Sequence, residues 1–317
     1  MMPKNSEDQF TIVSKDDELV EIVGLRAEIK VWCEKPFDEV PNEFLEAYEL
    51  LTVPIKNHLR WYQNYTMNRM SPATARTLSA PRTWLERGQK PIARMLYLKG
   101  PDEMKAAGQY VVGFLYHPDK AAYSDTNTPY LRQVTPAQDL EKDPERYLAT
   151  AKRLCDLLPV LCGHVGYSLE TSPYYEMQAY REAYALAMRH PGLNIASDHA
   201  TWPLRDEKGV EAVNWLTLVG STPLGKLGGA AELRRRLKAH RSISIIETPH
   251  GVIIRAGEQP QLGDVNRRED LPEYRAVYRA LKDVMDQVLT DFRPLPLGFA
   301  RPEKAEKTLR WLRRFES

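Results

Sequence analysis

Hydrophobic and charged residues alternate near the start of the chain, within the segment from Leu19 to Trp32. A period of two is typical of a strand that buries one face and leaves the other in solvent. We therefore expect a half-buried strand in this segment. The hydrophobic positions are Leu25, Ala27, Ile29 and Val31, and the charged positions between them are Arg26, Glu28 and Lys30.

Hydrophobic residues at steps of three and four predict the helices. The first stripe runs from Phe44 to Tyr62, and Pro54 is expected to kink this helix or to start a second one. Cap-then-proline pairs precede two further helices, because proline suits the first helical position. The other expected helices are one after Asp143-Pro144 with its apolar face at Leu148–Leu158, one after Ser172-Pro173 with its stripe at Met177–Met188, Glu232–His240, Tyr274–Leu289 and Glu303–Phe315.

Short aliphatic runs between turn residues predict the remaining strands. Thr248 to Gly251 is a hairpin turn between two of them, whereas residues 118–142, 197–210 and 256–271 read as loops. Strand pairs are interspersed with helices and do not alternate with them, so we expect an α+β fold with mostly antiparallel sheet packed with several amphipathic helices. The expected strands are Arg94–Lys99, Gln109–His117, His164–Leu169, Val213–Gly220, Ile243–Glu247 and Val252–Arg255.

The 317 residues suit one large domain or two closely packed halves. We expect a disordered N-terminus over residues 1–10, a single α+β domain over residues 11–300 and a basic C-terminal helix over residues 301–317. Two packed halves with a boundary near residues 120–143 are the alternative.

Composition and charge narrow the class of protein. The chain is 43% hydrophobic and 27% charged, which is typical of a globular protein, and its net charge of +1 gives no overall nucleic-acid signal. No hydrophobic run is long enough to span a membrane, and Met1 to Phe10 lacks the apolar stretch of a secretion signal. We therefore expect a cytoplasmic protein with no membrane partner. Its three cysteines, Cys33, Cys155 and Cys162, are expected to stay reduced and buried.

The charges are unevenly distributed along the first third of the chain. Residues 1–50 hold 13 Asp and Glu against 5 Lys and Arg, and residues 51–110 hold 10 Lys and Arg against 3 Asp and Glu. Two interpretations stay open. The two segments pack together and neutralise each other, or the acidic one forms a face for a basic partner.

Two segments resemble catalytic motifs without completing them. The turn Gly220-Ser-Thr-Pro-Leu-Gly-Lys226-Leu227 follows an expected strand as a phosphate-binding loop does, but Leu227 stands where such a loop needs Ser or Thr for Mg²⁺. Gly166-Tyr-Ser168-Leu-Glu170 resembles a nucleophile elbow, but Glu170 replaces the second small residue. The histidines show no metal-binding spacing. We therefore expect no catalytic residue, no cofactor and no metal, and keep a nucleotide-dependent enzyme using Gly220–Leu227 as the alternative.

A third interpretation is nucleic-acid binding by the basic C-terminal helix. Its cationic residues are Arg301, Lys304, Lys307, Arg310, Arg313 and Arg314. A solvated helix docked through Leu309, Leu312 and Phe315 explains the same pattern, so we expect no direct nucleic-acid partner.

Four segments in order along the chain carry a family resemblance. The sequence is similar to the bacterial type VI secretion immunity proteins, a family first catalogued as a domain of unknown function. The resemblance spans residues 15–290, and its most specific part is Gly263-Asp264-Val265-Asn266 followed by Leu271-Pro272. The segments are Gly163–Ser168, Val213–Gly220, Leu227–Leu233 and Glu247–Leu281.

The resemblance implies a protein that binds a cognate type VI effector toxin and occludes its active site without catalysis. A cytoplasmic nuclease with a restriction-endonuclease-like domain is the implied partner, and a homo-oligomer is left open. Because a nuclease is basic where it binds DNA, carboxylates are the expected contacts, with an aromatic anchor. The candidate partner-binding residues are Asp16, Asp17, Glu18, Glu21, Asp198, Trp202, Asp206, Glu207, Asn266, Glu269 and Asp270.

Overall fold

The structure is a computed structural model. It describes residues 8–17, 20–64, 66–86, 94–100, 103–116, 128–196, 209–289 and 301–316.

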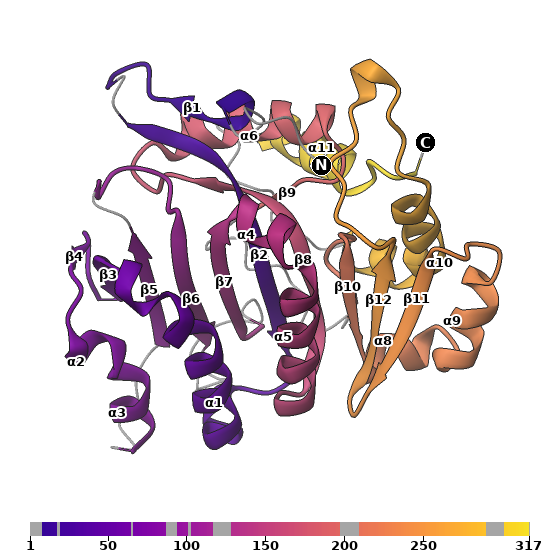
Figure 1. Cartoon of the computed structure of the whole chain (residues 1–317), viewed down its shortest axis with the longest axis horizontal. Coiled ribbons are helices and arrows are strands. Elements are labelled where there is room, and N and C mark those ends of the chain that lie inside the picture. Colours follow the sequence, from indigo (N-terminus) through magenta and orange to yellow (C-terminus); the bar gives the residue numbers. More distant parts are fainter. Residues whose placement is uncertain are drawn as a thin grey trace.

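Within these residues, 12 strands form one sheet, in the order β11-β12-β10-β8-β2-β7-β6-β5-β3-β4 (Figure 1). Outside this order, β1 pairs antiparallel with β2, and β9 pairs parallel with β8. The predicted α+β class with a mostly antiparallel sheet is confirmed. The strands are β1 Ile12–Val13, β2 Glu21–Cys33, β3 Trp61–Asn64, β4 Ser71–Pro72, β5 Arg94–Gly100, β6 Tyr110–Tyr116, β7 Tyr130–Pro136, β8 Val160–Thr171, β9 Asn194–Ile195, β10 Leu216–Gly220, β11 Ile243–Thr248 and β12 Gly251–Ala256.

The helices surround this sheet (Figure 1). The α-helices are α1 Pro41–Thr52, α2 Ala75–Leu78, α3 Ala80–Glu86, α4 Ala137–Lys142, α5 Pro144–Leu157, α6 Glu176–Arg189, α8 Ser221–Lys226, α9 Gly229–Leu237, α10 Pro272–Leu289 and α11 Arg301–Leu312. Short 3-10 turns are η1 Asp8–Phe10, η2 Phe37–Glu39, η3 Val53–His58 and η4 Val265–Arg267.

The apolar face of the central strands lies under α1, α4 and α5. Gln133 of β7 donates a hydrogen bond to the Leu51 carbonyl of α1 at 2.5 Å, and Tyr167 of β8 donates to Glu141 of α4 at 3.3 Å. Because Gln133 lies opposite Ile29 and Tyr167 opposite Ala27, these helices cover the face that carries the alternating aliphatic residues of β2. An aromatic cluster then holds α1 in place, with the rings of Phe44 and Phe114 5.1 Å apart in an edge-to-face arrangement.

β2 is buried on both faces, so the prediction of a half-buried strand is wrong in that respect. Arg26, Glu28 and Lys30 are at most 7% exposed. Glu28 and Lys30 have partners on neighbouring strands and on the segment after residue 208, as described below, and Arg26 pairs with Glu21 of the same strand. Alternation of hydrophobic and charged residues therefore identified the strand but not its surroundings.

Elements whose boundaries depend on neighbouring residues were predicted correctly. Asp143 caps α5 by accepting a hydrogen bond from the Arg146 backbone at 3.0 Å, and Pro144 occupies the first turn, as predicted. β11 and β12 form the predicted hairpin, with Thr248 opposite Gly251. A Cβ at Gly251 would lie 2.1 Å from the Val219 carbonyl, so glycine is required because β10 approaches closely.

Other expected boundaries are wrong. The helix expected from Phe44 to Tyr62 ends at Thr52 and continues as the 3-10 turn Val53–His58 that contains Pro54, while Tyr62 belongs to β3. The expected loop at residues 118–142 contains β7 and α4 in its described part, residues 128–142. Of the N-terminal residues expected to be disordered, Asp8–Phe10 form a 3-10 turn in which Phe10 is fully buried, and residues 1–7 lie outside the described part.

Two more elements begin elsewhere than predicted. α6 begins at Glu176 and is preceded by Tyr175, so the predicted cap Ser172 does not cap it. The Ser172 hydroxyl instead accepts a hydrogen bond from the Tyr174 backbone, just after the preceding strand. Met177 was assigned to the buried stripe of this helix but is 70% exposed. β10 begins at Leu216, three residues later than expected.

Candidate functional site

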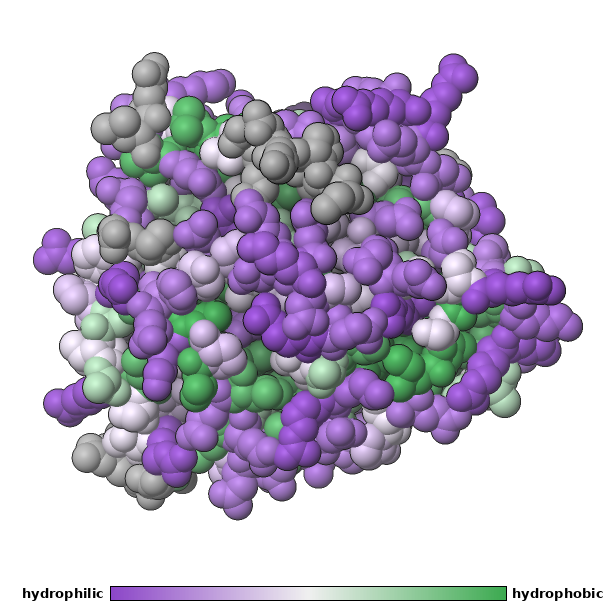
Figure 2. Space-filling view, viewed as in Figure 1, coloured by the Kyte–Doolittle hydropathy of each residue, from purple (hydrophilic) through white to green (hydrophobic). Residues whose placement is uncertain are grey.

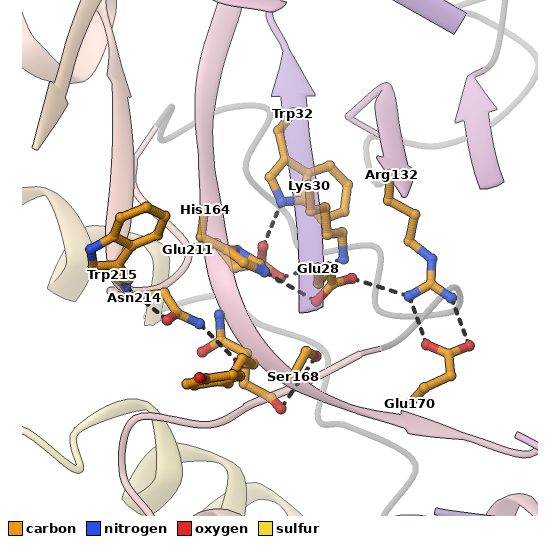
Figure 3. Close-up of polar contacts among 12 residues, drawn as sticks. Glu28, Lys30, Trp32, Arg132, His164, Ser168, Glu170, Glu211, Asn214 and Trp215 are labelled. Carbon is orange, nitrogen blue, oxygen red and sulfur yellow. Dashed lines mark hydrogen bonds and ion pairs between the residues drawn. The ribbon is translucent and has the colours of Figure 1, made fainter. Parts of the chain in front are cut away.

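A network of buried charges lies on the other face of the central strands (Figure 3). Arg132 of β7 binds both carboxylate oxygens of Glu170 of β8, at 3.1 and 3.0 Å, and also binds Glu28 of β2 at 3.1 Å. His164 Nε2 lies 3.2 Å from the other Glu28 oxygen. All four side chains are at most 5% exposed.

The network continues toward the segment that precedes β10. Trp32 donates its indole N–H to Glu211 at 2.5 Å, and the Lys30 ammonium lies 4.0 Å from the same carboxylate. This ammonium also lies 4.5 Å from the centre of the Trp32 ring. Acids and bases from β2, β7, β8 and the segment before β10 therefore neutralise one another in the interior.

The pairing keeps Glu28 ionised. Burial alone would raise the pKa of this carboxyl, but the hydrogen bond with His164 and the charges of His164, Arg132 and Lys30 together hold the pKa of Glu28 well below its usual range. A carboxylate stabilised in this way is a poor proton donor at neutral pH. Glu28, Arg132 and Glu170 each already bind a side chain on another strand. The network therefore holds β2, β7 and β8 together.

The segment that resembles a nucleophile elbow is the middle of β8. Ser168 is fully buried, and its hydroxyl lies 3.4 Å from the Asn194 carbonyl. Asn214 occupies the space beside Gly166, because a Cβ built there would lie 2.0 Å from the Asn214 amide oxygen. The Asn214 amide donates to the Tyr167 carbonyl at 3.1 Å. Ser168 therefore belongs to an extended strand, and a sharp nucleophile turn is not formed.

The segment that resembles a phosphate-binding loop is a helix. β10 ends at Gly220, and α8 begins directly at Ser221 and ends at Lys226. A phosphate-binding loop needs several backbone N–H groups in an open turn between its strand and its helix. Such a turn is not formed here, so the nucleotide-dependent alternative has no support in this geometry.

The loop that follows β12 projects from the molecule at the upper right of Figure 1. Its outer part, residues 263–270, contains η4 and closes on itself: the Asp264 and Glu269 backbones exchange hydrogen bonds of 3.2 and 3.0 Å. Asp264 is 3% exposed and binds Arg189 of α6 through both carboxylate oxygens, at 2.9 and 3.3 Å. The hydrogen bond with Arg189 lowers the pKa of Asp264 to about 2, although burial opposes this shift.

This loop brings together three of the predicted partner-binding residues. Asn266, Glu269 and Asp270 are all exposed there. Asp270 also lies 2.7 Å from Arg275 of α10, which orients its carboxylate back toward the molecule. The sequence predicts a solvated loop here. The structure shows that the contacts of Asp264 with Arg189 and Glu269 hold this loop in place.

A second group of predicted residues lies where β1 turns into β2. Asp16 is exposed and Asp17 partly buried, and the Glu21 carboxylate pairs with Arg26. This turn and the 263–270 loop lie at opposite ends of the upper edge in Figure 1. Glu18, Asp198, Trp202, Asp206 and Glu207 lie outside the described residues.

The turn after α11 directs inward one cation of the predicted basic helix, Arg314. Arg314 donates hydrogen bonds to the Pro191 carbonyl at 2.7 Å and to the Asn194 side chain at 2.8 Å. Burial lowers the pKa of Arg314 to about 9. Leu312 and Phe315 are at most 3% exposed. The end of this helix is therefore packed against the protein, as expected for a docked amphipathic helix.

The described residues hold no group of three or more His, Cys, Asp or Glu side chains arranged for a metal ion. Cys33, Cys155 and Cys162 are buried free thiols, as predicted, and burial raises the pKa of Cys155 to about 12. Among the helices described, none has the length and hydrophobicity to cross a bilayer.

Hydrophobic surface gathers in a band across the middle of the face shown in Figure 2, in the region where Figure 1 places α5 and β12, with hydrophilic residues around it. On the neighbouring edge strand β11, Ile243, Ile245 and Ile246 are only partly buried. Large hydrophobic side chains that are more exposed are scattered. They are Val13, Val53, Tyr174, Met177 and Val265.

Sequence reasoning missed the buried network and the exposure of Val265. A signal for the network was present, because the charged positions of β2 include both signs and β8 carries His164, Ser168 and Glu170 on alternate positions. Val265 is 58% exposed at the outer end of the 263–270 loop. No local pattern separates an exposed valine from a buried one.

Comparisons with known proteins add the family context. A family model described as TsiV, type VI immunity for VRR-NUC, matches residues 43–315. Among solved structures, the fold is similar to that of the Pseudomonas aeruginosa T6SS protein PA0821, with a TM-score of 0.81 and 18% sequence identity over 96% of this chain and 87% of that chain. This similarity shows a shared fold. No curated protein sequence matches the chain significantly.

Proposed function

The chain belongs to the TsiV family of type VI immunity proteins for VRR-NUC, and from this premise we propose that it binds a cognate VRR-NUC toxin and occludes the toxin's active site. The observation that carries the proposal is the family match, which covers all but the first 42 and the last 2 residues. The proposed place of action is the cytoplasm, where a nuclease toxin meets DNA.

We propose that neutralisation involves no catalysis by this chain. Glu28 and His164, an acid and a base at hydrogen-bond distance, are paired with each other inside the protein and are at most 5% exposed. An inhibitor that acts by occupancy needs only a surface with a slow dissociation rate, and such affinity comes from preorganised contacts.

Two exposed regions are candidates for the contact. One is the acidic turn with Asp16 and Asp17, and the other is the 263–270 loop with Asn266 and Glu269. Because Glu21 is engaged with Arg26, reversing its charge would also disturb β2. Asp16→Lys, at an exposed position, therefore tests the acidic turn more cleanly than a change at Glu21.

The test is inhibition of the purified toxin's nuclease activity at increasing amounts of this protein, with an unrelated nuclease as the control. Occlusion predicts an endpoint at a fixed molar ratio and a toxin that recovers full activity and unchanged mass after the complex is separated. Inhibition far below a one-to-one ratio, or a covalently altered toxin, would show that the chain works as an enzyme. Failure to form a complex with the cognate toxin would overturn the proposed function itself.

A further inference from the structure

The 263–270 loop is built to keep one shape. Its base is tied to α6 by the two hydrogen bonds between Arg189 and Asp264, and His190 Nδ1 lies 2.7 Å from the Gly263 carbonyl. Asp264 also accepts hydrogen bonds within the loop, from the Asn266 backbone at 2.9 Å. The loop projects from the body (Figure 1) and nevertheless has a buried anchor.

The backbone at the end of η4 is in an unfavourable conformation for its residue type. Arg268 has a φ of 60°, in the left-handed region that side chains with a Cβ rarely adopt, and no other described non-glycine residue has a positive φ. Such a conformation persists only where the surroundings determine it, and it is frequent at binding sites. It directs the chain from η4 back to the pairing between Asp264 and Glu269.

The loop exposes one hydrophobic side chain, which two arginines follow. Val265 is 58% exposed, and Arg267, at 69% exposure, and Arg268 follow it in sequence. Two of the three acids in the loop already have partners, Asp264 with Arg189 and Asp270 with Arg275. The exposed surface of the loop is therefore mixed: Val265, Arg267 and Arg268 are exposed together with Glu269, and the Arg267 guanidinium lies 3.8 Å from the Asp264 carboxylate.

We propose that the 263–270 loop is the part of this protein that enters the active site of the VRR-NUC toxin, with Val265 as its apolar contact and Arg267 and Arg268 as its cationic contacts. This inference rests on the proposed function and names the surface that performs it. A loop that already holds its bound conformation loses little conformational entropy on binding. Arginine can form two parallel hydrogen bonds with a carboxylate.

The experiment compares two valines of nearly equal exposure. Val265→Asp is matched by Val53→Asp, since Val53 is 55% exposed at the start of η3, on a different part of the chain. The affinity of each full-length variant for the cognate toxin, carrying an inactivated catalytic site, is measured by calorimetry. Thermal unfolding of both variants verifies that they are folded, because neither valine is buried.

The expected result is a loss of affinity of about 30-fold or more for Val265→Asp and no change for Val53→Asp. Val265→Ile is expected to retain binding, and Arg267→Ala with Arg268→Ala is expected to weaken binding and to reduce its salt dependence.

The outcomes separate the two levels of the proposal. If the unaltered protein binds the toxin and Val265→Asp binds as tightly as Val53→Asp, the loop is not the contact, and the proposed function stands without it. If the unaltered protein does not bind the toxin, the proposed function and this inference both fail.

Discussion

Arg189, the last residue of α6, holds Asp264, the residue that caps η4, through two hydrogen bonds across 75 positions of sequence. Asp264 is buried, whereas the residues that follow it are exposed. One ion pair therefore joins the projecting loop to a helix packed against the sheet. Together with the hydrogen bond between His190 and the Gly263 carbonyl, this contact anchors the loop to the body of the protein.

Arg189→Ala is predicted to loosen the loop while the fold remains. Because the Arg189 side chain is 43% exposed, the loss of global stability should be small. Amide hydrogen exchange over residues 264–270 should accelerate by at least about tenfold. Arg153→Ala, which removes an exposed arginine paired with Glu46, is the control. Unchanged exchange in the loop would show that Asp264 does not depend on Arg189.

Arg132→Met is predicted to destabilise the protein by about 3–5 kcal/mol, because it leaves Glu28 and Glu170 buried without their shared cation. Arg82→Met removes an arginine that pairs with Glu49 on the surface and should cost less than about 1 kcal/mol. Chemical denaturation of both variants measures the difference. Equal losses for the two would mean that the buried network contributes no more than a surface pair.

Gly166→Ala is predicted to destabilise the protein, because the new methyl group would overlap the Asn214 amide. Asn214→Ala also destabilises, since it removes the hydrogen bonds to the Tyr167 carbonyl and the Trp215 backbone. Combined, the two changes should cost less than the sum of their separate effects, by about 1 kcal/mol or more. Additive losses of thermal stability would refute a direct contact between the two positions.

Acid is predicted to weaken the fold as the pH falls below about 4. The pKa values of Glu28 and Asp264 are both lower in the folded protein than in the unfolded chain, so each group stabilises the fold above its unfolded pKa. That contribution is lost as the pH falls through the folded values. Unfolding free energies at several pH values measure the trend.

Glu28→Gln isolates the contribution of the buried network to this acid sensitivity. Since glutamine does not titrate, the variant should be less stable at neutral pH, and its stability should fall less steeply between pH 4 and 2. A variant whose stability falls as steeply as that of the unaltered protein would place the acid sensitivity elsewhere in the molecule.

Part of the candidate site was visible in the sequence. Asn266 ends the Gly263–Asn266 part of the family's most specific motif, Glu269 and Asp270 lie between it and Leu271-Pro272, and the structure gathers all three in one exposed loop. The charges at the loop base were not predictable as pairs, because Asp264 and Asp270 find their partners on α6 and α10. Val265 was not singled out, since its exposure depends on the direction in which the loop leaves the protein.

β7 shows the limit of sequence reasoning for the fold. Arg132, Gln133 and Thr135 gave their segment a polar, loop-like composition, yet all three are buried. Each is satisfied by a residue distant in sequence: Arg132 by Glu28 and Glu170, Gln133 by the Leu51 carbonyl, and Thr135 by Tyr147. Polarity predicts exposure only where no such partner exists.

The sequence alone determined the α+β class, the capped helix after Asp143, the β11–β12 hairpin and the helix predicted over Tyr274–Leu289, which the structure shows as α10. These features depend on residues within a few positions of one another, where spacing and turn chemistry decide the backbone. Only the tertiary structure decided which charges are buried and which loop is held in place. Burial and ion pairing depend on what packs against a residue, and for Glu28 and Asp264 those neighbours come from distant parts of the chain.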